Sequence, residues 1–241
     1  MDMPLPNPSP ADPRFAALYP GHNPALQSFI PPGTRCALDV GCGRGGMAAW
    51  LRRKAITVDG ISWNPHELEL AKAHCRAVLA CDLNHGLPQI HAEAYDLVIC
   101  SHVLEHIAYP QTLLADLHRV LQPRGHLLVA IPNLFFWPDR LKLFCGHWTY
   151  RQSGTFDYTH LRWYTRQSLT QLLAQHGFVL EHFAADGWIP IPGLRFFISP
   201  QLRSDINRLF CRLSPGLFGH QLLFAFRKSD ERRETPVPTA K

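Results

Sequence analysis

The chain has 241 residues, a formal charge of +5 and 46% apolar residues, which suits one large globular domain with an ample core. It contains no run of about 18 apolar residues, so no transmembrane helix is predicted, and its start lacks the basic and apolar regions of a secretory signal. The seven cysteines are scattered without a C-x-x-C pair, so we expect reduced thiols and a cytoplasmic protein. Lysines and arginines form no stripe, and no nucleic-acid partner is indicated.

The chain divides into three predicted parts. Nine prolines fall within the first 32 residues, and because proline removes a backbone donor and blocks helix, segment 1–32 is predicted to be extended and partly disordered. Residues 33–228 form the predicted domain. The mixed-charge segment 229–241 is predicted to be a disordered tail.

Apolar runs and helical periodicity alternate along the chain. The second predicted helix opens with Asn64 as N-cap, Pro65 at its first position and Glu67 three residues after the cap. Pro123 ends the third helix and Gly177 the last. Strands are expected at 36–40, 56–62, 77–83, 95–101, 126–132, 178–183 and 220–226, and helices at 47–53, 64–75, 112–125 and 168–178.

The predicted strands are apolar on both faces, which is typical of a parallel sheet covered by helices. Two segments interrupt the alternation: an aromatic-rich insert at about 133–166 and a second insert at about 186–219. They follow the fifth and sixth strands. Because α/β folds bind ligands beyond the carboxyl ends of their strands, both inserts are placed to cover a pocket.

A glycine-rich loop, in the sequence LDVGCGRGG, follows the first strand. Gly41, Gly43 and Gly46 also satisfy the dinucleotide pattern G-x-G-x-x-G. Asp39 argues against a dinucleotide, because a carboxylate two residues before the first glycine would repel a pyrophosphate. The end of the second strand also lacks the acid that would bind the adenosine ribose. An acid beside a glycine turn suits a cationic ligand instead.

LDVGCGRG resembles the first motif of the class I S-adenosylmethionine-dependent methyltransferases, and the resemblance continues in order through LACDLN, YDLVICSHVLEHI and LQPRGHLLVAIPN. It implies a Rossmann-like α/β fold with a mainly parallel seven-stranded sheet, helices on both faces and an antiparallel last strand. It also implies S-adenosylmethionine as the cofactor. The residues expected to bind it are Asp39, Gly41, Cys42, Gly43, Gly45, Ser62, Trp63, Asp82, Leu83, Ser101 and His102.

One position departs from the family's pattern. The acid that usually binds the ribose hydroxyls at the end of the second strand is replaced by Ser62. A neutral hydroxyl forms a weaker hydrogen bond to the ribose than a carboxylate does. Asp82 resembles the residue near the adenine. A fold that has lost cofactor binding is the alternative at this point.

The pentapeptide HVLEH at 102–106 matches the H-x-x-E-H pattern of zinc peptidases. That motif needs a helix, and here the helical pattern starts only after Pro110, so we treat the match as chance. The interpretation we favour is a wall of the cofactor and substrate pocket, with Ser101 and His102 against the cofactor.

Two alternatives stay open for this loop. In the first, Glu105 and His106 only brace it by hydrogen bonds. The second is a divalent metal held by His102, Glu105, His106 and a later histidine. It follows from a resemblance to the E-x-x-E-H loop of ubiquinone-pathway O-methyltransferases, which use a metal to orient substrate hydroxyls. We assign no residue as a metal ligand.

The first insert holds four phenylalanines, three tryptophans and three tyrosines. Its end, HLRWYT, resembles a segment that precedes the next helix in related methyltransferases. Methyl transfer to a hydroxyl needs a base, and histidine suits neutral pH. We therefore predict His160 as the first candidate catalytic base and His106 as the second. Substrate contacts are expected from Glu105, Trp137, Arg162 and Trp163.

The second insert alternates apolar patches with arginines. We predict a substrate lid there, with peripheral contact to a membrane or a lipid-linked substrate as the alternative. The predicted function is S-adenosylmethionine-dependent methylation of a small molecule, at oxygen. A non-catalytic cofactor-binding partner of a biosynthetic enzyme and an NAD-dependent reductase are the alternatives. The sequence leaves the oligomeric state open.

Overall fold

The computed structural model describes residues 21–189 and 198–230. The first 20 residues of the predicted proline-rich segment, residues 190–197 of the second insert and residues 231–241 of the predicted tail lie outside the described residues.

A seven-stranded sheet forms the centre of the molecule, in the order β3-β2-β1-β4-β5-β7-β6. Neighbouring strands from β3 to β5 run parallel, whereas β7 lies antiparallel between β5 and β6. The predicted mixed sheet with an antiparallel last strand is confirmed. The strands are β1 (Cys36–Val40), β2 (Thr57–Ser62), β3 (Ala77–Ala80), β4 (Tyr95–Ser101), β5 (Leu121–Pro132), β6 (Phe178–Asp186) and β7 (Gln221–Lys228).

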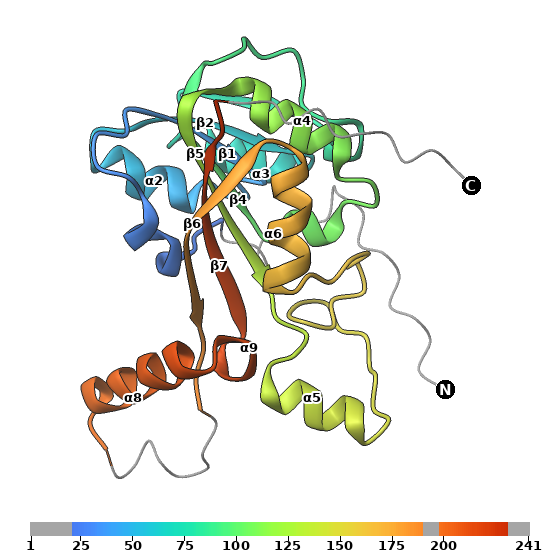
Figure 1. Cartoon of the computed structure of the whole chain (residues 1–241). Helices are drawn as coiled ribbons and strands as arrows, with labels where there is room; N and C mark the ends of the chain where they lie inside the picture. Colours follow the sequence, from blue (N-terminus) through green and yellow to red (C-terminus); the bar gives the residue numbers. More distant parts are fainter. Residues whose placement is uncertain (1–20, 190–197, 231–241) are drawn as a thin grey trace.

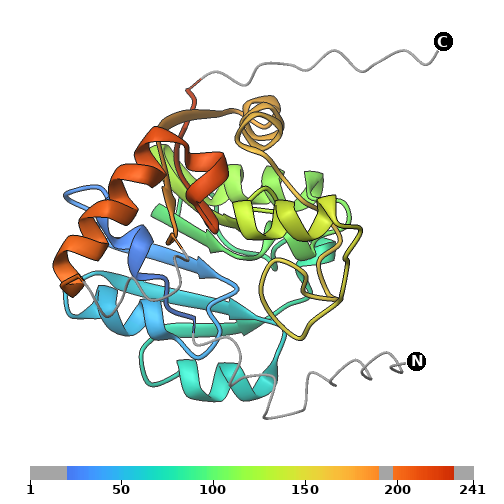
Figure 2. The ribbon, with the colours of Figure 1, turned by 90° about the horizontal axis from the view of Figure 1, so that it is seen from below.

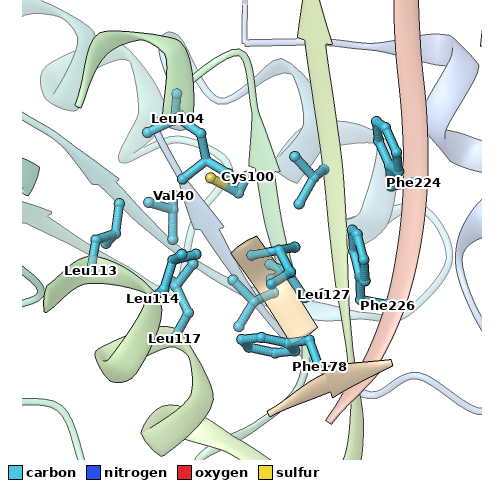
Figure 3. Close-up of a cluster of buried hydrophobic side chains, with 14 of the residues drawn as sticks. Val40, Cys100, Leu104, Leu113, Leu114, Leu117, Leu127, Phe178, Phe224 and Phe226 are labelled. Atoms are coloured by element: carbon cyan, nitrogen blue, oxygen red, sulfur yellow. The ribbon is translucent and has the colours of Figure 1, made fainter. Parts of the chain in front are cut away.

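Helices cover both faces of the sheet (Figure 1). On one face, α4 (Gln111–Val120) and α6 (Arg166–Gln175) bury leucines against the strands, and Figure 3 shows the α4 leucines in one cluster with Phe178 at its lower edge. On the other face, α2 (Gly46–Arg52) and the 3₁₀ helix η1 (Pro24–Phe29) pack a second apolar cluster. The central strands β1, β4, β5 and β7 are therefore largely buried on both faces, which explains why they read as continuous apolar runs.

Two expected boundaries are wrong. Helix α4, predicted to reach residue 125, ends at Val120. Strand β5 begins at the next residue, Leu121, five residues before its predicted start. A register shift between Tyr95 and Leu97 lets β5 pair with β4 across the extra residues around Pro123. Residues 24–29, predicted to be extended, form η1 because the Asn23 side chain accepts a hydrogen bond from the Ala25 N–H and caps the turn.

Other local predictions are confirmed. Helix α3 (Pro65–Ala71) has Asn64 as its N-cap and Pro65 as its first residue. Gly177 adopts a positive φ of 80° directly after the C-cap of α6.

Both inserts lie at the carboxyl edge of the sheet. The first carries α5 (Trp137–Phe144) between β5 and α6, and the second carries α8 (Pro200–Leu213) and α9 (Pro215–Phe218) between β6 and β7. Figure 2 looks at the molecule from this end and shows α8 and the loop after α5 on opposite sides of the view. Among the described residues, no helix combines the length and apolar character that crossing a membrane requires.

Candidate functional site

The glycine loop connects β1 to α2 at the carboxyl edge of the sheet. The Gly41 and Cys42 N–H groups both donate to the Ile61 carbonyl, at 2.8 and 2.9 Å, which ties the loop to the end of β2. Gly41 has a φ of +74°, and a Cβ there would lie 2.5 Å from Val103 Cγ2. Glycine is therefore required so that the 102–106 loop can approach the first turn closely.

Cys42 was predicted to bind the cofactor. Its side chain is fully buried, and its Sγ lies so close to Gly60 that a Cβ on that glycine would be 2.8 Å away. The thiol therefore packs against Gly60 of β2, beneath the loop, and the predicted contact of Cys42 with the cofactor stays a prediction.

Asp39 has the electrostatics expected of a cation site. The side chain is buried, and no described residue hydrogen-bonds its Oδ2 atom. Burial raises the pKa of Asp39 to about 7, because an isolated carboxylate is poorly solvated there. A buried carboxylate with an unsatisfied oxygen beside a glycine turn fits the α-ammonium of S-adenosylmethionine, which would supply the missing partner.

The edge formed by β2 and β3 holds the residues predicted near the ribose and adenine. Ser62 is buried and donates a hydrogen bond to Glu67, a partner that the sequence analysis did not include in the site. Trp63 is half exposed. Asp82 caps a short 3₁₀ helix, η2 (Leu83–His85), and its bonds with the Asn84 backbone and side chain lower its pKa. The structure thus brings all four predicted residues, including Leu83, to one edge.

His102 leaves the end of β4 with a positive φ of 56°. Gln221 of β7 donates from Nε2 to Asp186 at 2.9 Å, and a carboxylate can only accept, so the Gln221 Oε1 atom must face His102. His102 Nε2 lies 3.0 Å from that oxygen, and its Nδ1 lies 3.1 Å from Glu105 Oε1. Both ring nitrogens therefore donate, which describes an imidazolium paired with a buried carboxylate.

Opposing effects act on the pKa values of this pair. Burial would lower the pKa of His102, but the bonds to Glu105 and Gln221 outweigh it and raise the pKa. Burial likewise opposes ionisation of Glu105, yet the bond and charge of His102 hold its pKa below the ordinary value. Ser101 joins the same network through Asn23, whose side-chain amide donates to both Ser101 and Gln221.

A second cluster joins the 102–106 loop to the first insert. Glu105, His106 and His160 each offer a ligand atom within 4.8 Å of the others, and the two imidazole rings meet edge to face at 4.8 Å. Glu105 and His160 are buried, and no described residue hydrogen-bonds Glu105 Oε2. The structure therefore brings both predicted bases together with an acid, although His160 is 54 residues further along the chain than His106.

Hydrogen bonds fix the tautomers of both histidines. His160 Nδ1 lies 3.2 Å from the Thr155 carbonyl, which can only accept, so Nδ1 carries the proton. The Thr159 hydroxyl donates to Asp157 at 2.7 Å and therefore accepts from His106 Nδ1 at 2.9 Å. In the neutral rings, both Nε2 atoms keep a basic lone pair.

Contacts place the predicted substrate residues Arg162 and Trp163 beside this cluster, whereas among the described residues no hydrogen bond or ring contact joins Trp137 to it. Trp163 contacts His160 at 6.4 Å between ring centroids. Trp137 begins α5 and has a buried indole N–H without an acceptor among the described residues. Arg162 Nε donates to the Ala108 carbonyl at 2.6 Å, so this arginine at least braces the loop. Its contact with an anionic substrate stays a prediction.

Three comparisons place the chain among known proteins. A family described as "Methyltransferase domain" matches residues 14–182. A ubiquinone biosynthesis O-methyltransferase of Pectobacterium atrosepticum is 31% identical over 101 residues, which is 40% of this chain and 42% of that protein. The ubiquinone biosynthesis O-methyltransferase of Vibrio atlanticus is 32% identical over 104 residues, which is 41% of this chain and 44% of that protein. The matched parts thus span less than half the length of these curated relatives.

Among solved structures, a S-adenosylmethionine-dependent methyltransferase from Archaeoglobus fulgidus covers 90% of this chain and 100% of its own, with a TM-score of 0.63 and 19% identity. The fold is therefore that of the class I methyltransferases. The chain belongs to the methyltransferase-domain family, and S-adenosylmethionine is the cofactor expected for it. At the level of family, fold and cofactor, the prediction from the sequence is confirmed.

Proposed function

We propose that the protein transfers the methyl group of S-adenosylmethionine to a hydroxyl oxygen of a small, partly apolar molecule. The observation that carries this proposal is the pair of basic imidazoles, His106 and His160, beside the buried Glu105 carboxylate. An oxygen acceptor must lose its proton, and a neutral histidine is the side chain suited to take it near pH 7. The names of the curated relatives, which are O-methyltransferases, support transfer to oxygen.

The bound cofactor would supply a methyl group on a sulfonium, whose sulfur leaves with the carbon–sulfur electron pair when the oxygen attacks. His160 takes the hydroxyl proton at Nε2. Burial lowers the pKa of His160, so the ring is neutral at pH 7, and Glu105 opposes this by favouring the protonated form. Glu105 therefore stabilises the imidazolium as it forms.

An aromatic cluster supports an apolar acceptor with a ring. Trp148 meets Phe156 at 4.9 Å and Trp163 at 5.5 Å, and Trp163 in turn meets His160. These rings form one wall that leads to the proposed base. Such a wall would hold an aromatic acceptor and keep water away from the reacting groups.

The same three side chains support a second candidate, a divalent metal that orients the acceptor's hydroxyls. Two imidazole nitrogens and one carboxylate suit a borderline cation. The hydrogen bonds from His106 to Thr159 and from His160 to Thr155 are those that metal-binding histidines make through their second nitrogen. The two candidates differ in whether turnover survives removal of metal.

Formation of S-adenosylhomocysteine with a panel of phenols and catechols tests the proposal. We expect turnover with at least one acceptor and at least a tenfold lower kcat for His160→Ala, which follows from the usual contribution of a general base. His91→Ala, at an exposed histidine, is the matched control. Turnover that survives chelation supports the base, and turnover that returns only with added metal supports the second candidate. The absence of turnover with every acceptor would favour the non-catalytic partner.

A further inference from the structure

Glu67 has an unusual position for an acid. It is the third residue of α3, and only 4% of its surface is exposed. Burying a carboxylate is costly unless it receives hydrogen bonds. Its Oε2 atom receives one from Ser62 Oγ, at 2.5 Å, while no described residue hydrogen-bonds its Oε1 atom.

The start of α3 does not account for this carboxylate. In a capping box, Glu67 would accept a hydrogen bond from the backbone N–H of Asn64. That N–H instead donates to Ser62 Oγ at 3.1 Å, and the Asn64 side chain accepts from the His66 and Glu67 N–H groups. The helix start is therefore satisfied without the Glu67 side chain.

The position of Ser62 suggests what the carboxylate does. Ser62 is the last residue of β2, directly after Ile61, whose carbonyl holds the glycine loop. This is the position where the resembling methyltransferases carry an acid on the ribose hydroxyls. Ser62 donates its only hydrogen to Glu67, so its oxygen can only accept toward a ligand.

We propose that Ser62 and Glu67 together replace the missing acid, and that Glu67 supplies the negative charge that holds the ribose hydroxyls of the cofactor. The serine oxygen accepts a hydrogen bond from one ribose hydroxyl. The Glu67 carboxylate, which is hydrogen-bonded to that serine, either polarises this contact or accepts from the second ribose hydroxyl through Oε1. Glu67 is thus a positioning residue for the cofactor. The inference rests on the cofactor alone and is independent of the methyl acceptor.

Calorimetric titration of the full chain tests this with two ligands, S-adenosylhomocysteine and its analogue without the two ribose hydroxyls. The wild type should prefer the parent ligand about tenfold or more, since hydrogen bonds to a charged group are the strong ones. Glu67→Gln should lose most of this preference while its affinity for the analogue stays unchanged. Glu69→Gln, at an exposed acid two residues away, is the control and should behave as the wild type.

The combined change Ser62→Asp with Glu67→Gln moves the acid to the end of β2 and should restore the preference. This rescue separates a contact with the ribose from a general effect on folding. The proposal is overturned if Glu67→Gln keeps the wild-type preference, or if it weakens both ligands equally, as a merely structural role would. Neither result depends on finding an acceptor, so failure here is distinct from failure of the proposed O-methylation.

Discussion

Replacing Asp39 by Asn should weaken cofactor binding and stabilise the free protein at the same time. The carboxylate is buried and no described residue hydrogen-bonds its Oδ2 atom. Above pH 7 the free protein therefore holds a poorly solvated charge that a cationic ligand would satisfy. Asparagine keeps the shape of the side chain and removes the charge. A residue that only supported the fold would instead lose stability on this change.

The magnitude follows from the pKa. Burial raises the pKa of Asp39 from 3.8 to about 7, which corresponds to about 4 kcal/mol at most. For an acid whose folded-state pKa is raised, this cost is absent below the unfolded pKa and grows as the pH rises from about 4 to 7. The Asn variant should therefore be more stable at pH 8, by up to about 4 kcal/mol, and the gain should shrink toward acid.

Ligand binding should have its own pH dependence. A cation beside Asp39 lowers its pKa, so binding below pH 7 releases a proton. The affinity of S-adenosylhomocysteine, which keeps the α-ammonium, should then rise up to about tenfold per pH unit between pH 5.5 and 7 and level off above. Calorimetry on wild type and Asp39→Asn measures this, and the variant's profile should be flatter. Equal slopes for the two proteins, or a less stable variant at pH 8, would refute the reasoning.

Three further predictions concern catalysis, the fold and the second insert. Because burial lowers the pKa of His160, kcat should stay constant from pH 8 down to about 6.5 and fall at lower pH, measured as a pH–rate profile. In denaturant titrations, Gly41→Ala should lower the free energy of unfolding by about 1–3 kcal/mol, because the new side chain is strained at a positive φ and clashes with Val103. Gly33→Ala should cost less, because Gly33 also has a positive φ but has open space around it. The second insert is predicted to be a substrate lid, so the wild type should not float with anionic vesicles in a flotation assay. Flotation that is abolished when Leu209 and Leu213, which are exposed on α8, are both changed to Asp would favour the membrane alternative instead.

Residues whose role depends on local sequence were predictable. The glycine loop, the N-cap Asn64 and the apolar strands follow from backbone requirements and burial, which short patterns record. Asp39 could also be predicted, because its charge stands beside the loop in the sequence as well as in space.

Residues whose role depends on distant partners were not predictable. Gln221 fixes the protonation of His102 from 119 residues away, and the tautomer of His106 depends on Asp157 through Thr159. Competition between near neighbours is equally hidden: the spacing of Asn64 and Glu67 favours a capping box, but Ser62, two residues before Asn64, takes the backbone donor instead. Periodicity carries no information about such side-chain choices.

The place of β7 in the sheet has a consequence for how the protein is made. β7 is the last of the described strands in sequence, yet it lies between β5 and β6 and carries Gln221 to His102. While the chain is being synthesised, His102 lacks this acceptor and β5 lacks its outer neighbour until β7 leaves the ribosome. The nascent protein should therefore acquire its finished site only after β7 has been synthesised, with the edge of β5 open to mispairing until then.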